Sequence, residues 1–264
     1  MVIEKHENAP RKIALRLSYD GTNYHGWQEQ RDDVTVGGTV VNALRRVCGE
    51  VAHFTGCGRT DAGVHALRYC VSFETNGTIP AERIPYAVNT LLPPDISVSA
   101  SIEAPEDFNA ILSCEKKEYT YKLINTRIRD PFLAGRALFY PQRLDFDAME
   151  KAAANFVGTH DFAAVRSVGT QTKTTVRTVH WFEVEREGNS VTFRVCADGF
   201  LYNMARAMVG TLLYVSEGKL AAEDIPALLD QRDRQLTGPT APPQGLYLTR
   251  IWYGGAVGEM MSLD

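Results

Sequence analysis

The residues from Gly58 to Ala66 combine a carboxylate, a guanidinium and two glycines at a spacing that is compatible with a catalytic loop. They read Gly-Arg-Thr-Asp-Ala-Gly-Val-His-Ala. The guanidinium of Arg59, two positions away, favours the ionised form of the Asp61 carboxylate. A held, ionised carboxylate can act as a nucleophile or stabilise a cation, particularly at the electron-poor C1′ of a sugar. Asp61 is therefore the first candidate for a catalytic group.

The same run also has an ordinary structural interpretation. Asp and Thr are common in turns and helix caps, glycines supply positive φ, and an exposed Arg–Asp pair contributes little to stability. A phosphate loop is excluded, because Val64 and His65 stand where that motif needs Lys and Ser or Thr. Hydrolysis of a glycosidic bond usually needs a second carboxylate, and the run contains no other acid. A rearrangement fits a single Asp better than a hydrolysis does.

Five blocks of the chain resemble the TruA-type family of tRNA pseudouridine synthases, which modify positions 38 to 40 of the anticodon arm. They are YDGTNYHGWQEQ (19–30), GRTDAGVH (58–65), KEYTY (117–121), FLYNMARAMVG (200–210) and TAPPQGLYL (240–248). The blocks occur in the family's order and extend over almost the whole chain. The resemblance implies that the protein isomerises uridine to pseudouridine in tRNA, within one nucleotide and without a cofactor or a metal ion.

The resemblance also implies a set of site residues. Asp61 would either attack C1′ or take the C2′ proton, and the sequence does not choose between these routes. Tyr119 would stack on the target base and help to remove the C5 proton. Arg206 would pair with Asp61, and Leu246 would form the floor of the uracil pocket. Arg59 would occupy the space left by the flipped base. The structural alternatives are strand packing for Tyr119 and Leu246 and a solvent-directed side chain for Arg206.

Other residues near these blocks are expected to have supporting roles. His65 is not needed as an acid or a base, and we expect it to order the loop. Trp27 and His25 could contact RNA or anchor their own loop, and anchoring is favoured. Cys57, beside the Asp61 loop, is expected to be a small buried apolar residue rather than a metal ligand.

Composition predicts a soluble cytoplasmic protein. The 264 residues are 44% hydrophobic and 23% charged, and no apolar run approaches the length of about 18 residues that a membrane span needs. The five cysteines include no CxxC pair, which indicates reduced thiols rather than disulfides or a zinc site. The net charge of −4 is unusual for an RNA-binding protein. Positive charge is concentrated locally, because residues 116–143 hold seven Lys and Arg side chains against Glu118 and Asp130.

Hydrophobic periodicity predicts a mixed α/β fold. Strands are expected over residues 12–20, 51–57, 67–75, 96–102, 118–125, 175–186, 190–197 and 247–253. Helices are expected over residues 36–49, 80–92, 145–157, 201–216 and 222–231, with Asp145 as a helix cap and Gly188-Asn189 in a hairpin turn. Both tails, residues 1–10 and 254–264, are expected to be disordered.

The family resemblance implies a pseudouridine synthase fold, with two ferredoxin-like α/β halves whose sheets join around a central active-site cleft. We place the boundary near Pro105. Residues 1–105 then form an N-terminal half with the Asp61 loop, and residues 106–264 form a C-terminal half with the Tyr, Arg and Leu pocket residues. The repeated pattern Asp-Gly-x-x-Tyr, at Asp20 and again at Asp198, is weak support for a duplication.

The expected partners are the anticodon arm of tRNA and a second copy of the chain, since members of this family act as homodimers. The chain departs from the family pattern at residues 36–39, where a Gln is usual, and at Arg68-Tyr69, where Gly-Gln is usual. These departures bear on RNA contacts rather than on the chemistry. Three alternatives stay open: a synthase of the same fold acting on another RNA, a non-catalytic RNA-binding or RNA-folding protein, and a ribosyl hydrolase.

Overall fold

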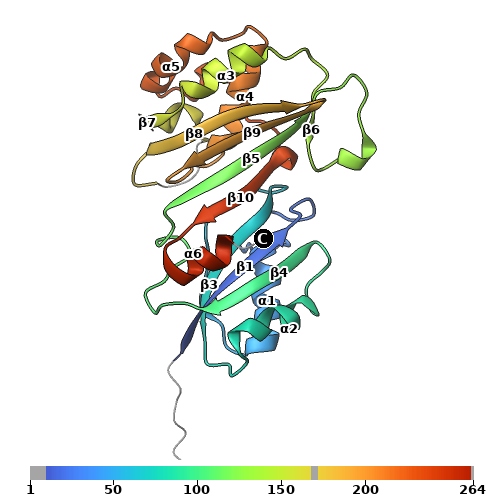
Figure 1. Ribbon diagram of the computed structural model, residues 1–264, viewed down its shortest axis with the longest axis vertical. Coiled ribbons are helices and arrows are strands. Elements are labelled where there is room, and N and C mark those ends of the chain that lie inside the picture. The colour runs from blue at the N-terminus through green and yellow to red at the C-terminus, as the bar shows by residue number, and fades with distance from the viewer. Residues whose placement is uncertain (1–9, 168–171, 263–264) are drawn as a thin grey trace, which may run out of the picture. The chain divides into compact units, whose positions relative to one another are not determined.

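The protein is described by a computed structural model that covers residues 10–167 and 172–262 (Figure 1). Its contacts divide the chain into two compact units. Unit 1 consists of Met1–Ala62, Ala66–Glu115 and Ile251–Asp264, and unit 2 consists of Gly63–His65 and Lys116–Arg250. The expected disorder of residues 1–9 lies outside the described residues. The division into halves at Pro105 stays a prediction.

Unit 1 contains a small antiparallel sheet with helices packed against it. Its strands are β1 (Arg11–Tyr19), β2 (Ala52–Gly56), β3 (His65–Thr75) and β4 (Ile96–Glu103). β1 pairs with β4 on one side and with β3 on the other, and β2 pairs with β3. The helices α1 (Val36–Cys48) and α2 (Ile84–Asn89) contact each other. All four predicted strands and the first helix are confirmed.

Local signals explain where the helices of unit 1 begin. Thr35 caps α1, because its hydroxyl accepts a hydrogen bond from the backbone N–H of Gly38 at 3.2 Å. The second helix is shorter than expected, since a 3₁₀ turn at Ala81–Arg83 precedes α2. Pro85 lies in the first turn of α2, where its missing N–H leaves no hydrogen bond unmade.

The C-terminal segment is ordered, which corrects the expectation of a disordered tail. Residues Gly255–Ser262 form helix α6, and its Val257, Met260 and Met261 side chains are buried. The guanidinium of Arg16 on β1 donates a hydrogen bond to the carbonyl of Met260 at 3.0 Å. The segment is short and contains glycines, so burial of its apolar residues stabilises it rather than intrinsic helix propensity.

Unit 2 contains a larger sheet with its helices gathered on one face (Figure 1). Its strands are β5 (Lys116–Ile124), β6 (Leu138–Phe139), β7 (Gly158–Asp161), β8 (Val176–Glu187), β9 (Ser190–Ala197) and β10 (Leu246–Trp252). The order is β10-β5-β9-β8-β7, with β6 paired to β5. The helices are α3 (Phe146–Ala154), α4 (Met204–Ser216) and α5 (Ile225–Gln231).

Most of unit 2 follows the sequence pattern. The Asp145 carboxylate caps α3 by accepting from the N–H of Ala148 at 3.1 Å, and β8 and β9 form the predicted hairpin. Gly188 in its turn has a φ of +58°, which a glycine adopts without strain. The short strands β6 and β7 were not predicted. The mixed α/β class is confirmed, and among the described residues no helix is long and apolar enough to cross a membrane.

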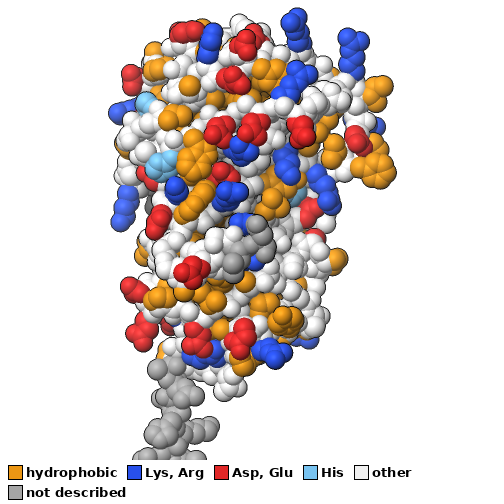
Figure 2. Space-filling view, in the orientation of Figure 1, with side chains coloured by type: hydrophobic (Ala, Val, Ile, Leu, Met, Phe, Trp, Pro, Cys, Tyr) orange, Lys and Arg blue, Asp and Glu red, His pale blue; other side chains and the backbone are white. Residues whose placement is uncertain are grey.

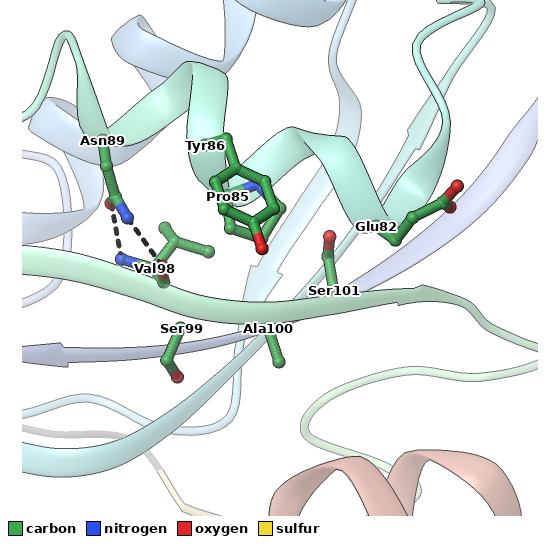
Figure 3. Close-up of a pocket in the computed structure, with 8 residues that line it drawn as sticks. All are labelled: Glu82, Pro85, Tyr86, Asn89, Val98, Ser99, Ala100 and Ser101. Carbon is green, nitrogen blue, oxygen red and sulfur yellow. Dashed lines mark hydrogen bonds between the residues drawn. The ribbon is translucent and has the colours of Figure 1, made fainter.

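A cavity of about 380 Å³ lies in unit 1 between α2 and β4 (Figure 3). The amide of Asn89 donates to the carbonyl of Val98 at 2.8 Å and accepts from its N–H at 2.9 Å. This side chain therefore covers part of the free edge of β4, which limits pairing with another strand. The lining residues are Glu82, Pro85, Tyr86, Asn89, Val98, Ser99, Ala100 and Ser101, none of which is a predicted site residue.

Candidate active site

Three aromatic residues of unit 1 make hydrogen bonds to the loop after β2. The backbone N–H of Trp27 donates to the carbonyl of Thr60 at 3.1 Å. The hydroxyls of Tyr19 and Thr60 are 2.8 Å apart. The Tyr69 hydroxyl donates to the carbonyl of Gly58. Thr60 is buried. The residues directly before Asp61 are therefore fixed to the sheet.

These aromatic residues form one buried cluster. Trp27 is only 6% exposed, and its ring centroid lies 4.1 Å from that of Tyr69, 5.9 Å from that of Phe54 and 6.2 Å from that of Tyr19. A Cβ atom on Gly56 would lie 2.5 Å from the indole nitrogen of Trp27, so only glycine fits there. The expectation that Trp27 anchors its loop is confirmed.

The segment beside Trp27 also approaches the Asp61 loop closely. Gly26 has a φ of +83°, and a Cβ atom there would lie 2.4 Å from the carbonyl oxygen of Thr60. Unlike the buried Trp27, His25 has an exposed side chain. It is 62% exposed, and its Nδ1 is 3.6 Å from a carboxylate oxygen of Asp33. Gly26 is thus required for the contact, whereas His25 lies at the surface.

Asp61 and Arg59 differ in their surroundings. Asp61 is half-buried, whereas Arg59 is exposed. Within residues 10–167 and 172–262, the Arg59 guanidinium has neither an ion pair nor a hydrogen-bond partner. The direct Arg59–Asp61 pair suggested by their spacing is therefore not formed, and the Arg59 side chain is exposed.

The second part of the same motif belongs to unit 2. His65 is 2% exposed, and its Nε2 lies 3.2 Å from the carbonyl oxygen of Gln244. Its ring also stacks on Tyr247, with centroids 4.6 Å apart. These contacts confirm that His65 orders the end of the loop.

Tyr119 and Leu246 are both buried in unit 2. Tyr119, on β5, is 8% exposed and packs edge-to-face on Phe200, with ring centroids 4.9 Å apart. Leu246 is 6% exposed and starts β10, the strand next to β5. The two residues therefore lie on neighbouring strands of one sheet.

Tyr121, two residues after Tyr119, ties the segment before β10 to β5. Its hydroxyl donates to the carbonyl of Pro242 at 2.8 Å, and a Cβ atom on Gly245 would lie 2.6 Å from its ring. Burial raises the pKa of Tyr121, so the phenol stays protonated as a donor.

Arg206 in the first turn of α4 is held by bonds to fixed acceptors. Its Nε donates to the carbonyl of Ala241 at 2.7 Å, and the Ala241 N–H donates back to the carbonyl of Arg206 at 3.1 Å. A terminal guanidinium nitrogen donates to Oδ1 of Asn203 at 2.8 Å. The half-buried Arg206 therefore does not extend freely into solvent.

Asn203 was not predicted, although it organises this arrangement. It precedes α4 with a φ of +62°, a left-handed conformation, and its amide nitrogen donates to the hydroxyl of Ser167 at 2.9 Å. Asn tolerates this conformation better than most residues do. An Asn directly before an apolar helix is the sequence signal that could have identified it.

The predicted site residues thus fall into two groups. Arg59 and Asp61 belong to unit 1, whereas Tyr119, Arg206 and Leu246 belong to unit 2 together with His65 of the motif. Within unit 2, Arg206 and Leu246 are connected through the segment from Ala241 onward. All five cysteines are free thiols, and the described residues contain no grouping of His, Cys, Asp and Glu that could hold a metal ion.

Comparison with known protein families finds a match over most of the chain. A family model described as tRNA pseudouridine synthase matches residues 17–112 and 152–254. The chain belongs to the tRNA pseudouridine synthase family. The matched ranges include Asp61, Arg206 and Leu246, while Tyr119 lies between them. The enzyme class and the family implied by the five sequence blocks are confirmed.

Bacterial relatives named tRNA pseudouridine synthase A match over their full length. The relative from Acetivibrio thermocellus is 44% identical over 92% of this chain and 100% of its own. Those from Caldicellulosiruptor bescii and Ruminiclostridium cellulolyticum are 42% and 43% identical, with the same coverage. A solved Cbf5-Nop10-Gar1 complex is similar at a TM-score of 0.37 and 14% identity, over 89% of this chain and 48% of that one.

Proposed function

We propose that this protein converts uridine to pseudouridine at positions 38, 39 and 40 in the anticodon stem-loop of tRNAs. The observation that carries the proposal is the family match, which includes the Asp61 loop in unit 1 and the Arg206 and Leu246 segments in unit 2. Relatives named tRNA pseudouridine synthase A align over their full length, which supports tRNA as the substrate class.

The reaction begins at Asp61 in this proposal. The N1–C1′ bond breaks, the detached uracil rotates, and a C5–C1′ bond forms, while the proton on C5 is lost and N1 gains one. Asp61 either attacks C1′ to give a covalent intermediate or removes the C2′ proton to give a glycal. Atoms and charge balance in both routes without a redox partner, so no cofactor is needed.

The other residues bind the flipped uridine, orient Asp61 and fill the space that the uridine leaves. Tyr119 stacks on the base and assists loss of the C5 proton, Leu246 floors the uracil pocket, and Arg206 pairs with the Asp61 carboxylate. The hydrogen bonds from Arg206 to Asn203 and Ala241 support this role, because they fix the guanidinium before substrate binds. Arg59 occupies the space of the flipped base, which its exposure favours.

The working enzyme is a cytoplasmic homodimer whose two subunits both contact the tRNA. Residues 1–105 supply the half with the Asp61 loop, and residues 106–264 supply the half with Tyr119, Arg206 and Leu246. A dimer mass for the purified protein, measured with and without tRNA, tests the oligomeric state.

The function is tested with unmodified tRNA that carries tritium at C5 of uridine. We expect the wild type to release tritium without free uracil, and we expect Asp61→Ala to release none. Pseudouridine mapped to positions 38 to 40 then assigns the sites. Free uracil would identify a ribosyl hydrolase, modification elsewhere would identify another RNA target, and binding without release in both proteins would identify a non-catalytic RNA-binding protein.

A further inference from the structure

The segment between β5 and β6, residues 125–137, exposes two large apolar side chains. Ile128 is 83% exposed and Phe132 is 88% exposed. Figure 1 shows this segment as a loop with one helical turn that extends away from the strands of unit 2. Two large apolar side chains exposed within one short segment form a candidate binding surface, and the charges around them decide which partner it fits.

The segment makes hydrogen bonds within itself and to β10. The Asp130 carboxylate accepts from the N–H of Phe132 at 2.9 Å, and the Thr126 hydroxyl donates to the carbonyl of Ile128 at 2.8 Å. The buried Tyr247 donates its hydroxyl to the carbonyl of Arg136 at 2.6 Å. The two apolar side chains are therefore presented on a fixed backbone, which limits the entropy lost when a partner binds.

Positive charge surrounds the two apolar side chains. Arg127, Arg129 and Arg136 are exposed in the same segment. Between residues 119 and 144 the sole acid is Asp130, and its carboxylate is used in the cap. Figure 2 shows orange and blue side chains next to each other over this part of unit 2. The chain as a whole has a net charge of −4, so this surface is opposite in sign to the average.

We propose that Phe132, Ile128 and the neighbouring arginines form a docking surface for the tRNA substrate, separate from the residues proposed for chemistry. The proposal rests on the proposed function. The Phe132 ring stacks on an unpaired base, Ile128 packs beside it, and the guanidinium groups contact phosphates. Apolar side chains interleaved with Arg suit RNA, which offers flat bases and negative phosphates together.

A second copy of the chain fits this surface less well than RNA does. A two-fold contact through the segment would place the positively charged segment of one copy against the same positively charged segment of the other. Like charges brought together at an interface weaken the association. The charge of the segment therefore favours a polyanion.

The test uses a double substitution, Ile128→Ser with Phe132→Ser, in the full-length protein. Leu112→Ser is the matched control, because Leu112 is 81% exposed in unit 1. We expect the double variant to bind unmodified tRNA about tenfold more weakly in a filter-binding assay. Its tritium-release rate at saturating tRNA should fall less than its affinity does. Circular dichroism confirms that each variant is folded.

The charges are tested with Arg127→Gln and Arg129→Gln together. We expect a smaller slope of log affinity against log salt concentration than in the wild type, by about one unit or more. An unchanged tRNA affinity in both sets of variants would overturn the inference, and so would a loss of dimer mass in the Ser variant at unchanged affinity. Failure of the proposed function gives a different result, namely no tritium release from the wild type itself.

Discussion

The two regions that carry the proposed catalytic residues are held by different kinds of interaction. In unit 1, a buried cluster of aromatic rings around Trp27 fixes the backbone of the Asp61 loop. In unit 2, a chain of polar contacts runs from Ser167 through Asn203 and Arg206 to Ala241. In unit 1 the hydrogen bonds to the loop come from residues whose rings pack together in the core, whereas in unit 2 the contacts are polar bonds among side chains and carbonyl groups.

This difference predicts how each region responds to mutation. Removing a large buried ring loses contact area and leaves a cavity, so stability falls strongly. A single hydrogen bond contributes about 1 kcal/mol net, yet it fixes the direction of a side chain. Substitutions in the aromatic cluster should therefore destabilise the protein, whereas substitutions in the polar chain should reduce the rate with little loss of stability.

Trp27→Ala should have the largest effect on stability. The loss of a buried indole typically destabilises a protein by about 3–5 kcal/mol. Urea unfolding followed by circular dichroism measures it, and Trp27→Phe, which keeps a ring in the cluster, should lose less than half as much. A change below about 1 kcal/mol for Trp27→Ala would contradict the view that packing holds the loop.

Gly26→Ala should have the next largest effect. The new Cβ atom would meet the Thr60 carbonyl at 2.4 Å in a backbone with a φ of +83°. We expect a loss of about 2–3 kcal/mol together with reduced tritium release. Gly218→Ala is the control, since Gly218 has a φ of +70° and open space around its Cβ position. An equal loss in both variants would show that backbone strain, rather than contact with the loop, causes the effect.

Substitutions of Asn203 should lower the catalytic rate much more than they lower the stability of the fold. Asn203→Gly keeps the left-handed backbone and removes both amide hydrogen bonds, whereas Asn203→Ala also strains the backbone. We expect a single-turnover rate about tenfold lower in both variants, with a loss of about 1 kcal/mol in stability for Ala beyond that for Gly. Asn203→Asp keeps the acceptor for Arg206 and should restore part of the rate. Wild-type rates in Asn203→Gly would show that the polar chain does not position Arg206.

A half-buried ion pair outside both regions should have the smallest effect. A hydrogen bond from Lys12, with Nζ at 2.6 Å from the carboxylate, lowers the pKa of Glu74. A lowered carboxyl pKa stabilises the fold above the unfolded pKa, and this contribution is lost as the pH falls from about 5 to about 3. Lys12→Met should lose less than about 1 kcal/mol at pH 7 and nothing at pH 3. Equal losses at both pH values would exclude the ion pair as the cause.

The sequence predicted the elements that have a strong local pattern. The alternation in β1 and the Asp145 cap of α3 are examples. It did not predict α6, because three buried residues on a short segment with glycines give no clear periodicity. It also missed the short strands β6 and β7, which exist only through pairing with distant segments.

The candidate site was predicted as residue types but not as contacts. Asp61, Arg206 and Leu246 were identified from family blocks, yet the residues that hold them are distant in sequence. Trp27 reaches Thr60 across the chain, and Ala241 reaches Arg206 through a close approach of two backbones. At that approach a Cβ atom on Gly210 would lie 1.7 Å from the carbonyl of Pro239. Such contacts depend on the tertiary fold and leave no local signal.

The most direct test of the account is the single-turnover conversion of tRNA by Asp61→Asn. This substitution keeps the size of the side chain and removes its charge and nucleophilicity. With a tRNA that has uridine at positions 38 to 40, we expect the wild type to form pseudouridine there. We expect the variant to bind the same tRNA and to convert it at least about 10³-fold more slowly. Conversion by Asp61→Asn within tenfold of the wild-type rate would contradict the role of Asp61.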